Sequence, residues 1–150
     1  MKNLLLLGSL LVLCVGGGAL IGAGNTPDGW YEALAKPWFN PPNWIFGPVW
    51  TVLYIMIAVA GWRTFRRDGA TAAKAAWIAQ LVFNFSWSPS FFTLHAIGLA
   101  LAASLAMLAA IVFFIVATWR PDRTSALLFV PYAAWVAFAT LLTASIFWLN

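Results

Sequence analysis

The chain contains very few charged residues. Of its 150 residues, 8% are charged and 63% are hydrophobic, and the mean hydropathy is +0.89. A typical soluble domain is about 45–50% apolar and about 25% charged. So few charged side chains cannot cover the surface of a soluble protein of this size, which argues against a soluble enzyme, a nucleic-acid-binding protein and a disordered chain. The composition predicts an integral membrane protein.

Cysteine and buried ionisable groups are scarce as well. A single cysteine, Cys14, excludes an intramolecular disulfide and a cysteine-cluster metal site. No Asp, Glu, Lys, Arg or His lies near the middle of a long apolar run, where ion-coupled transporters place such groups. His95 is the only histidine and lies near the end of an apolar run with no second candidate ligand nearby. We therefore expect no metal site and assign His95 to capping or to solvent.

Five apolar stretches are long enough to cross a bilayer, which takes about 20 residues for a core of ~30 Å. They are Leu4–Ala23, Trp44–Trp62, Ala72–Ser88, Ala96–Trp119 and Ser125–Leu149. The runs are continuous rather than alternating, which disfavours a β-barrel. The sequence predicts an all-α integral membrane protein, a five-transmembrane-helix bundle forming one domain over residues 1–150.

Three local features qualify this plan. Lys2 and the first apolar run are compatible with a secretory signal peptide, but a run of about 20 residues after one basic residue favours a retained span. Pro89 is expected to end the third helix and Pro131 to kink the fifth. Small residues spaced by four, Gly18/Gly22 and the Gly98–Ala110 series, indicate either tight packing within the bundle or a dimer interface.

The basic residues predict the orientation. Lys36 is alone on one side of the five-helix plan, whereas the other side collects seven basic residues: Lys2, Arg63, Arg66, Arg67, Lys74, Arg120 and Arg123. The positive-inside rule then places the N-terminus in the cytoplasm and the first loop and the C-terminus outside. A bacterial inner membrane is the simplest location, and a mitochondrial outer membrane is the eukaryotic alternative.

The ten tryptophans form two groups. Trp44, Trp62, Trp77, Trp119 and Trp148 lie near helix ends, where an aromatic belt keeps the indole N–H wet. Trp30 and Trp38 lie in the first loop, and Trp50 lies about two turns into the second predicted helix. Trp87 lies in the last turn of the third and Trp135 close to the middle of the fifth. A belt does not explain this second group.

Helical spacing collects the deeper aromatic residues on common faces. Trp50 and Tyr54 are four apart, Asn84 and Trp87 are three apart, and Trp135, Phe138 and Ala139 share a stripe. If these faces converge, they enclose an aromatic cavity with the Asn84 amide as its polar group. Such a cavity suits a large planar apolar ligand. The alternative is plain aromatic packing with Asn84 bonded to a neighbouring helix.

Three segments carry a family resemblance. WYEALAKPWFNPPNWIFGPVWTVLY (Trp30–Tyr54), LVFNFSWSPSFF and VPYAAWVAFATLL are similar to the tryptophan-rich sensory protein/translocator protein family (TspO, also called the peripheral benzodiazepine receptor). The resemblance covers essentially the whole chain. It implies a membrane bundle, commonly a homodimer, that needs no cofactor and binds porphyrins such as protoporphyrin IX and heme. It also implies sterol and isoquinoline carboxamide ligands, in a pocket under the first loop (residues 24–43).

Carried over to this chain, the family pocket implies eight ligand-binding residues, to which the aromatic pattern adds Trp38 and Tyr54. The eight are Tyr31, Pro41, Trp50, Asn84, Trp87, Trp135, Phe138 and Ala139. Thr143 departs from the family, which often has asparagine there. The short sterol motif is incomplete, because no basic residue follows Tyr132 within the required spacing.

The resemblance leaves three functions open. The first is a porphyrin-binding receptor or sensor. The second is light-dependent breakdown of protoporphyrin IX, for which Trp50 and Trp135 are the catalytic candidates, since the sequence offers no acid–base pair or activated nucleophile. The third is tetrapyrrole transport, which no inverted repeat or coupling-ion site supports. We expect the first.

Overall fold

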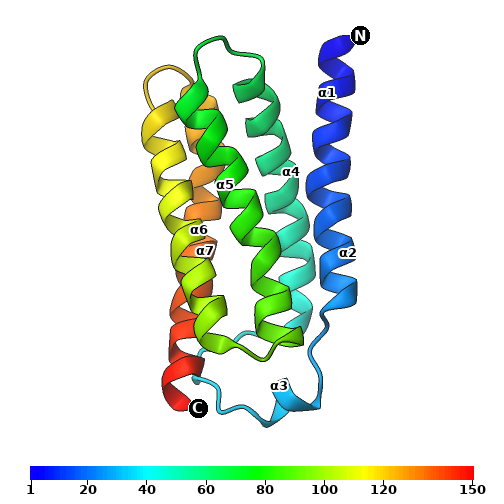
Figure 1. Cartoon of the computed structure of the whole chain (residues 1–150), viewed down its shortest axis with the longest axis vertical. Coiled ribbons are helices and arrows are strands. Elements are labelled where there is room, and N and C mark those ends of the chain that lie inside the picture. Colours follow the sequence, from blue (N-terminus) through cyan, green and yellow to red (C-terminus); the bar gives the residue numbers. More distant parts are fainter.

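The computed structural model describes all 150 residues, and it contains helices without a β-strand. Five long helical stretches lie side by side (Figure 1). The first consists of α1 (Lys2–Leu11), the π-helical turn η1 (Val12–Gly16) and α2 (Gly17–Gly24). The others are η2 (Asn43–Ile45) with α4 (Phe46–Phe65), α5 (Thr71–Ser88) with η3 (Pro89–Thr93), α6 (Ile97–Thr118) and α7 (Arg123–Leu149). A short helix, α3 (Gly29–Ala33), lies in the loop between α2 and η2.

Four of these stretches are long and apolar enough to cross a membrane. They are Lys2–Gly24, Asn43–Phe65, Ile97–Thr118 and Arg123–Leu149. Large apolar side chains stay exposed along the bundle, among them Val52, Leu105 and Leu141, as expected for contact with lipid. The fifth stretch, α5, packs beside the others but is more polar. The fold is therefore an all-helical membrane protein with four candidate spans.

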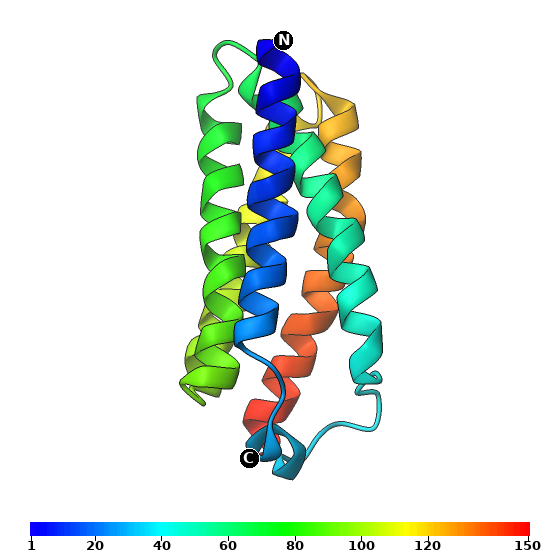
Figure 2. The ribbon, with the colours of Figure 1, turned by 90° about the vertical axis from the view of Figure 1, so that its right-hand side faces the viewer.

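The loop between α2 and η2, residues 25–42, covers one end of the bundle. Figure 2 shows this loop crossing beneath the helices at the end where the C-terminus lies. We call it the lid. The C-terminal residue holds it, because Asn150 Nδ2 donates to the Ala35 carbonyl at 2.9 Å and Asn150 Oδ1 accepts from the Ala35 amide at 3.0 Å.

At the opposite end, Asp122 joins two helices. Its carboxylate caps α7 by accepting hydrogen bonds from the Ser125 amide and hydroxyl, and it pairs with Arg63 of α4 at 2.8 Å. Desolvation acts to raise the pKa of Asp122, but the hydrogen bonds from Arg63 and Ser125 outweigh it and hold the pKa below its ordinary value. The carboxylate therefore stays ionised and keeps both bonds.

Close packing in the core depends on glycine. A Cβ on Gly61 would lie 2.6 Å from the Trp77 indole, and a Cβ on Gly18 would lie 2.2 Å from the Tyr54 ring. Gly98 also faces a neighbouring helix, with Phe147 3.3 Å from an added Cβ. Gly18 and Gly98 therefore serve packing within the chain.

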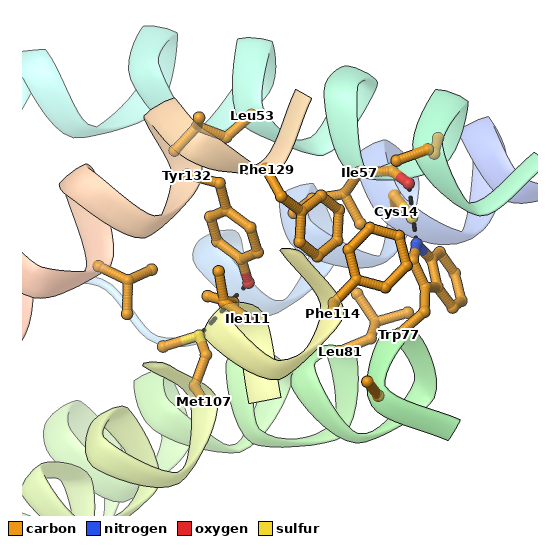
Figure 3. Packing of buried hydrophobic residues seen from close by; sticks show 14 of the residues in the cluster. Cys14, Leu53, Ile57, Trp77, Leu81, Met107, Ile111, Phe114, Phe129 and Tyr132 are labelled. Atoms are coloured by element: carbon orange, nitrogen blue, oxygen red, sulfur yellow. Dashed lines mark hydrogen bonds between the residues drawn. The ribbon is translucent and has the colours of Figure 1, made fainter. Parts of the chain in front are cut away.

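Trp77 is not in an aromatic belt. It lies in the core with Cys14, Ile57 and Phe114 (Figure 3), is 3% exposed, and donates from Nε1 to the Ile57 carbonyl at 2.9 Å. Its belt assignment was wrong, because position in the sequence gives depth but not the direction of the side chain. Trp44 and Trp148, by contrast, are exposed.

The two prolines behave differently from each other. The α-helical pattern of α5 ends at Ser88 as predicted, but the chain does not leave the helical region there. Ser88 keeps φ −60° and ψ −46°, and the wider turn η3 follows. Pro131 lies inside α7, which continues on both sides of it. Because η3 continues the helical path, Phe91 stacks on Trp87 and Phe92 meets Trp87 edge to face at 5.9 Å.

Candidate functional site

A cavity of about 530 Å³ lies between the helices next to the lid. Its walls come from all five helical stretches. The lining residues are Val15, Gly18, Ala19, Ile21, Gly22, Asn25, Pro27, Tyr31, Asn43, Phe46, Gly47, Trp50, Thr51, Tyr54, Asn84, Trp87, Ser88, Phe91, Phe92, Ser104, Met107, Ala139, Leu142, Thr143 and Ile146. No Asp, Glu, Lys, Arg or His is among them. The cavity is therefore an uncharged space bounded by apolar and aromatic side chains.

Two aromatic pairs, carried by different helices, form parts of the wall. On α4, the rings of Trp50 and Tyr54 have centroids 5.5 Å apart and are tilted by 31°. At the end of α5, Trp87 stacks on Phe91 with centroids 5.1 Å apart and an angle of 15°. Flat aromatic faces on two helices match the shape of a planar ligand.

The wall contributed by α2 consists mostly of small residues. Gly18, Ala19 and Gly22 line the cavity there together with Ile21, and Gly47 lines it from α4. Ala19, Gly22 and Gly47 are also exposed. We infer that the cavity has an opening between α2 and α4, where these exposed residues line it.

The polar end of the cavity is a chain of hydrogen bonds that runs into the core. Tyr54 Oη donates to Asn84 Oδ1, Asn84 Nδ2 donates to Tyr132 Oη, and Tyr132 Oη donates to Gln80 Oε1, each at 2.7 Å. Gln80 Nε2 then donates to the Trp77 carbonyl at 2.8 Å. Asn84 thus bonds to two other helices and is not a free amide waiting for a ligand.

Sequence reasoning missed Gln80 and Tyr132 in this chain. A signal was available, since Gln80 and Asn84 are four apart and are the two amide residues of an otherwise apolar run. Polar residues on one face of a membrane helix point to a partner on a neighbouring helix.

The lid brings Tyr31 over the cavity. Asp28 caps α3 by accepting from the Tyr31 amide at 3.1 Å, and Lys36 lies over the Tyr31 ring, 4.5 Å from its centroid. Tyr31 also meets Phe92 edge to face at 5.4 Å. Burial raises the pKa of Tyr31, and a hydrogen bond with Asn40 acts in the opposite direction. Its hydroxyl stays neutral at the cavity wall.

Six of the ten sequence-predicted ligand residues line the cavity. They are Tyr31, Trp50, Tyr54, Asn84, Trp87 and Ala139. The other four do not line it: Trp38, Pro41, Trp135 and Phe138. Trp38 is 95% exposed on the lid surface. The lining also includes residues outside the predicted set, among them Phe46, Phe92 and Met107.

Trp135 packs outside the cavity for a geometric reason. Its ring meets Phe46 at 5.8 Å and Phe138 at 5.7 Å, and Phe138 in turn meets Phe39 of the lid at 6.2 Å. These four rings fill the contact between α4, α7 and the lid. The cavity face of α7 is made instead by Ala139 and the residues three to seven positions beyond it. Trp135, Phe138 and Ala139 share one predicted helix face, but Ala139 lines the cavity whereas Trp135 and Phe138 pack against α4 and the lid.

Comparison with known proteins identifies the family. Residues 10–149 match the TspO/MBR family. The tryptophan-rich sensory protein of Cereibacter sphaeroides is 39% identical over 132 residues, covering 88% of this chain and 83% of that protein. The tryptophan-rich protein TspO of Archaeoglobus fulgidus is 36% identical over 155 residues, covering 100% and 99%. The human translocator protein is 35% identical over 118 residues, covering 75% and 70%. This chain belongs to the TspO/MBR family of membrane proteins.

Proposed function

We propose that the protein is a membrane receptor that binds porphyrins, such as protoporphyrin IX or heme, and other planar apolar ligands in the cavity beside the lid. One observation carries the proposal: an uncharged cavity of about 530 Å³ is lined by aromatic pairs on two helices. Ligand pockets are commonly about 300–1,000 Å³ with mostly apolar walls and few polar groups. A tetrapyrrole ring stacks on the Trp50 and Trp87 sides, and its carboxylates point toward the lid, where Asn25 and Asn43 line the cavity.

The names of related proteins support a role in sensing or transfer. The relative from Cereibacter sphaeroides is called a sensory protein and the human relative a translocator protein. No Asp, Glu, Lys, Arg or His lines the cavity to drive pumping. We therefore favour a receptor over an active transporter.

Light-dependent breakdown of protoporphyrin is less well supported. The two indoles expected to act on the ligand were Trp50 and Trp135. Trp50 lines the cavity, whereas Trp135 packs between α4, α7 and the lid. A ligand in the cavity meets one of the two.

We further propose that all five helical stretches cross the membrane. With 18 residues, α5 is about 27 Å long, close to the ~30 Å core of a bilayer. Its polar side chains Gln80 and Asn84 are buried and hydrogen-bonded inside the bundle, so they are hidden from lipid. Five crossings place Lys36 and the lid outside and the seven other basic residues in the cytoplasm of a bacterial cell.

The receptor proposal is tested by titrating purified protein with protoporphyrin IX and following the shift of the porphyrin absorption band. Replacing Trp50 with Leu keeps an apolar side chain but removes the flat ring. Loss of one stacking partner is expected to weaken binding by about threefold to tenfold. Trp148→Leu, at an exposed position outside the cavity, is the control. Equal affinity in both variants and the parent protein would show that the porphyrin does not bind in this cavity.

A further inference from the structure

We propose that His95 is a positioning residue that fastens the lid in a pH-dependent way and so controls ligand release. The part about ligand release rests on the proposed function. The imidazole of His95 stacks on the Trp30 indole, with centroids 4.0 Å apart and an angle of 17°. Its Nε2 lies 3.6 Å from Asp28 Oδ2. Trp30 and Asp28 both belong to the lid, whereas His95 belongs to the turn between η3 and α6.

The backbone presents His95 to the lid. Its φ of 51° makes it the only residue other than glycine with a left-handed backbone conformation. Few residues other than glycine adopt that conformation, and Asn, Asp and His are the ones that do so most often. Nearby, the hydroxyl of Thr93, the last residue of η3, donates to Asn25 Oδ1, which is a second contact with the lid. The end of η3 and the turn after it therefore hold the lid through two side chains.

These contacts reach the cavity wall directly. The second oxygen of Asp28, Oδ1, accepts the hydrogen bond from the Tyr31 amide that begins α3. Tyr31 lines the cavity, and Trp30 meets another lining residue, Phe91, edge to face at 5.7 Å. A change at His95 thus acts on residues adjacent to the ligand space without touching the ligand.

The protonation state of His95 decides how strongly the lid is held. Imidazolium attracts the Asp28 carboxylate and the electron-rich face of Trp30, whereas neutral imidazole retains only stacking and packing. Asp28 is the ionisable partner on the lid side. Elsewhere on the lid, Lys36 is engaged with the Glu32 and Leu34 carbonyls and the Tyr31 ring. Neither η3 nor α6 carries an ionisable side chain.

The charged form of His95 binds the Asp28 carboxylate and the Trp30 ring more tightly than the neutral form does, so the attachment of the lid strengthens as pH falls and weakens as pH rises. The side chains of His95 and Asp28 are both about half exposed, so the change in how tightly the lid is held is modest. An exposed ion pair together with an exposed cation–π contact corresponds to about threefold to tenfold in the lid equilibrium.

The first test uses the ligand-free protein in lipid nanodiscs. Hydrogen exchange of the lid amides, expressed as protection relative to unstructured peptide, is compared at pH 5.5 and pH 8. We expect about threefold to tenfold more protection at pH 5.5. His95→Asn tolerates the left-handed backbone, and Asp28→Asn still caps α3, while each removes one charge. Both are expected to abolish the pH dependence, and Glu32→Gln on the same lid is expected to keep it.

The second test measures the dissociation rate of protoporphyrin IX from the same proteins. Release is expected to be slower at pH 5.5 than at pH 8 in the parent protein and in Glu32→Gln, and equally fast at both in His95→Asn and Asp28→Asn. Lid protection that does not change with pH, or that keeps its pH dependence in both charge-removing variants, would overturn the latch. If lid protection follows pH but protoporphyrin does not bind, the latch holds and the porphyrin proposal fails.

Discussion

Tyr54 links the packing of the bundle to the cavity. Its ring faces Gly18 on one side and Trp50 on another, and its hydroxyl bonds to Asn84. The glycine is required by distance, because an added Cβ would lie 2.2 Å from the ring. Any side chain at position 18 therefore moves either the ring or the helix that carries Gly18.

Gly18→Ala is expected to destabilise the protein by about 1–3 kcal/mol, the usual cost of forcing an extra carbon into a packed site. Thermal unfolding in detergent, followed by circular dichroism, measures the loss. Gly8→Ala on the same helical stretch is the control, because nothing lies within 4 Å of its added Cβ. There the lower helix propensity of glycine predicts unchanged or higher stability. Equal melting temperatures for the two variants would contradict the packing role of Gly18.

Residue identity predicted some of the residues that line the cavity, but not which residues form hydrogen bonds with them. The spacing of Trp50 and Tyr54 placed both on one face of a helix, and both line the cavity. Asn84 was also expected there, yet its two amide atoms are used by Tyr54 and Tyr132. Those partners come from other helices, and helix-to-helix register cannot be read from a single sequence.

At the scale of elements, α5 and α7 are joined through polar atoms in the core. Tyr132 of α7 is fully buried between Asn84 and Gln80 of α5 and also lies 3.4 Å from Met107 Sδ. Hydrogen bonds between membrane helices contribute about 0.6 kcal/mol on average and up to about 1.7 kcal/mol. This junction joins α5, the most polar of the five stretches, to the remainder of the bundle.

Tyr132→Phe is expected to lower stability by about 1–2 kcal/mol, because it leaves the Asn84 amide and the Gln80 carbonyl oxygen without a partner. Gln80→Leu has a similar effect, and the double variant loses less than the sum, with a coupling of about 0.5–1.5 kcal/mol. Unfolding equilibria in mixed micelles give these values. Ser145→Ala, whose hydroxyl bonds only within its own helix, is the control and is expected to be near neutral. Strict additivity would show that the chain of bonds does not couple the two helices.

Element positions were more predictable than element surfaces. Each of the five apolar runs overlaps a helical stretch, because length and apolarity act on the whole run. Four runs match the ends of their stretch to within about three residues, whereas the third stops at Ser88, before η3. The π-helical turns η1 and η3 and the short helix α3 were not predicted, since each depends on a few local contacts. The position of Trp135 was not predicted either, because residues on one face of α7 are divided between the cavity wall and the contact with α4.

For the whole molecule, the distribution of basic residues predicts which end faces the cytoplasm. Cys14, the single cysteine, is fully buried, so an introduced cysteine can be labelled selectively. In bacterial cells, Thr26→Cys in the lid is expected to react with a membrane-impermeant maleimide from outside. Asp68→Cys, in the turn between α4 and α5, is expected to react only after the membrane is opened. The reverse pattern would overturn the orientation, and labelling of both from outside would overturn an odd number of crossings between them.

The opening between α2 and α4 affects how binding is measured. Ala19, Gly22, Gly47 and Thr51 line the cavity and are also exposed on the sides of two apolar helices. A hydrophobic molecule that enters there comes from the bilayer, so its concentration per lipid, and not per volume of buffer, drives occupancy. The dissociation constant expressed in total ligand then rises in proportion to the lipid added. Molecules with equal contacts in the cavity are selected by how strongly they partition into the membrane.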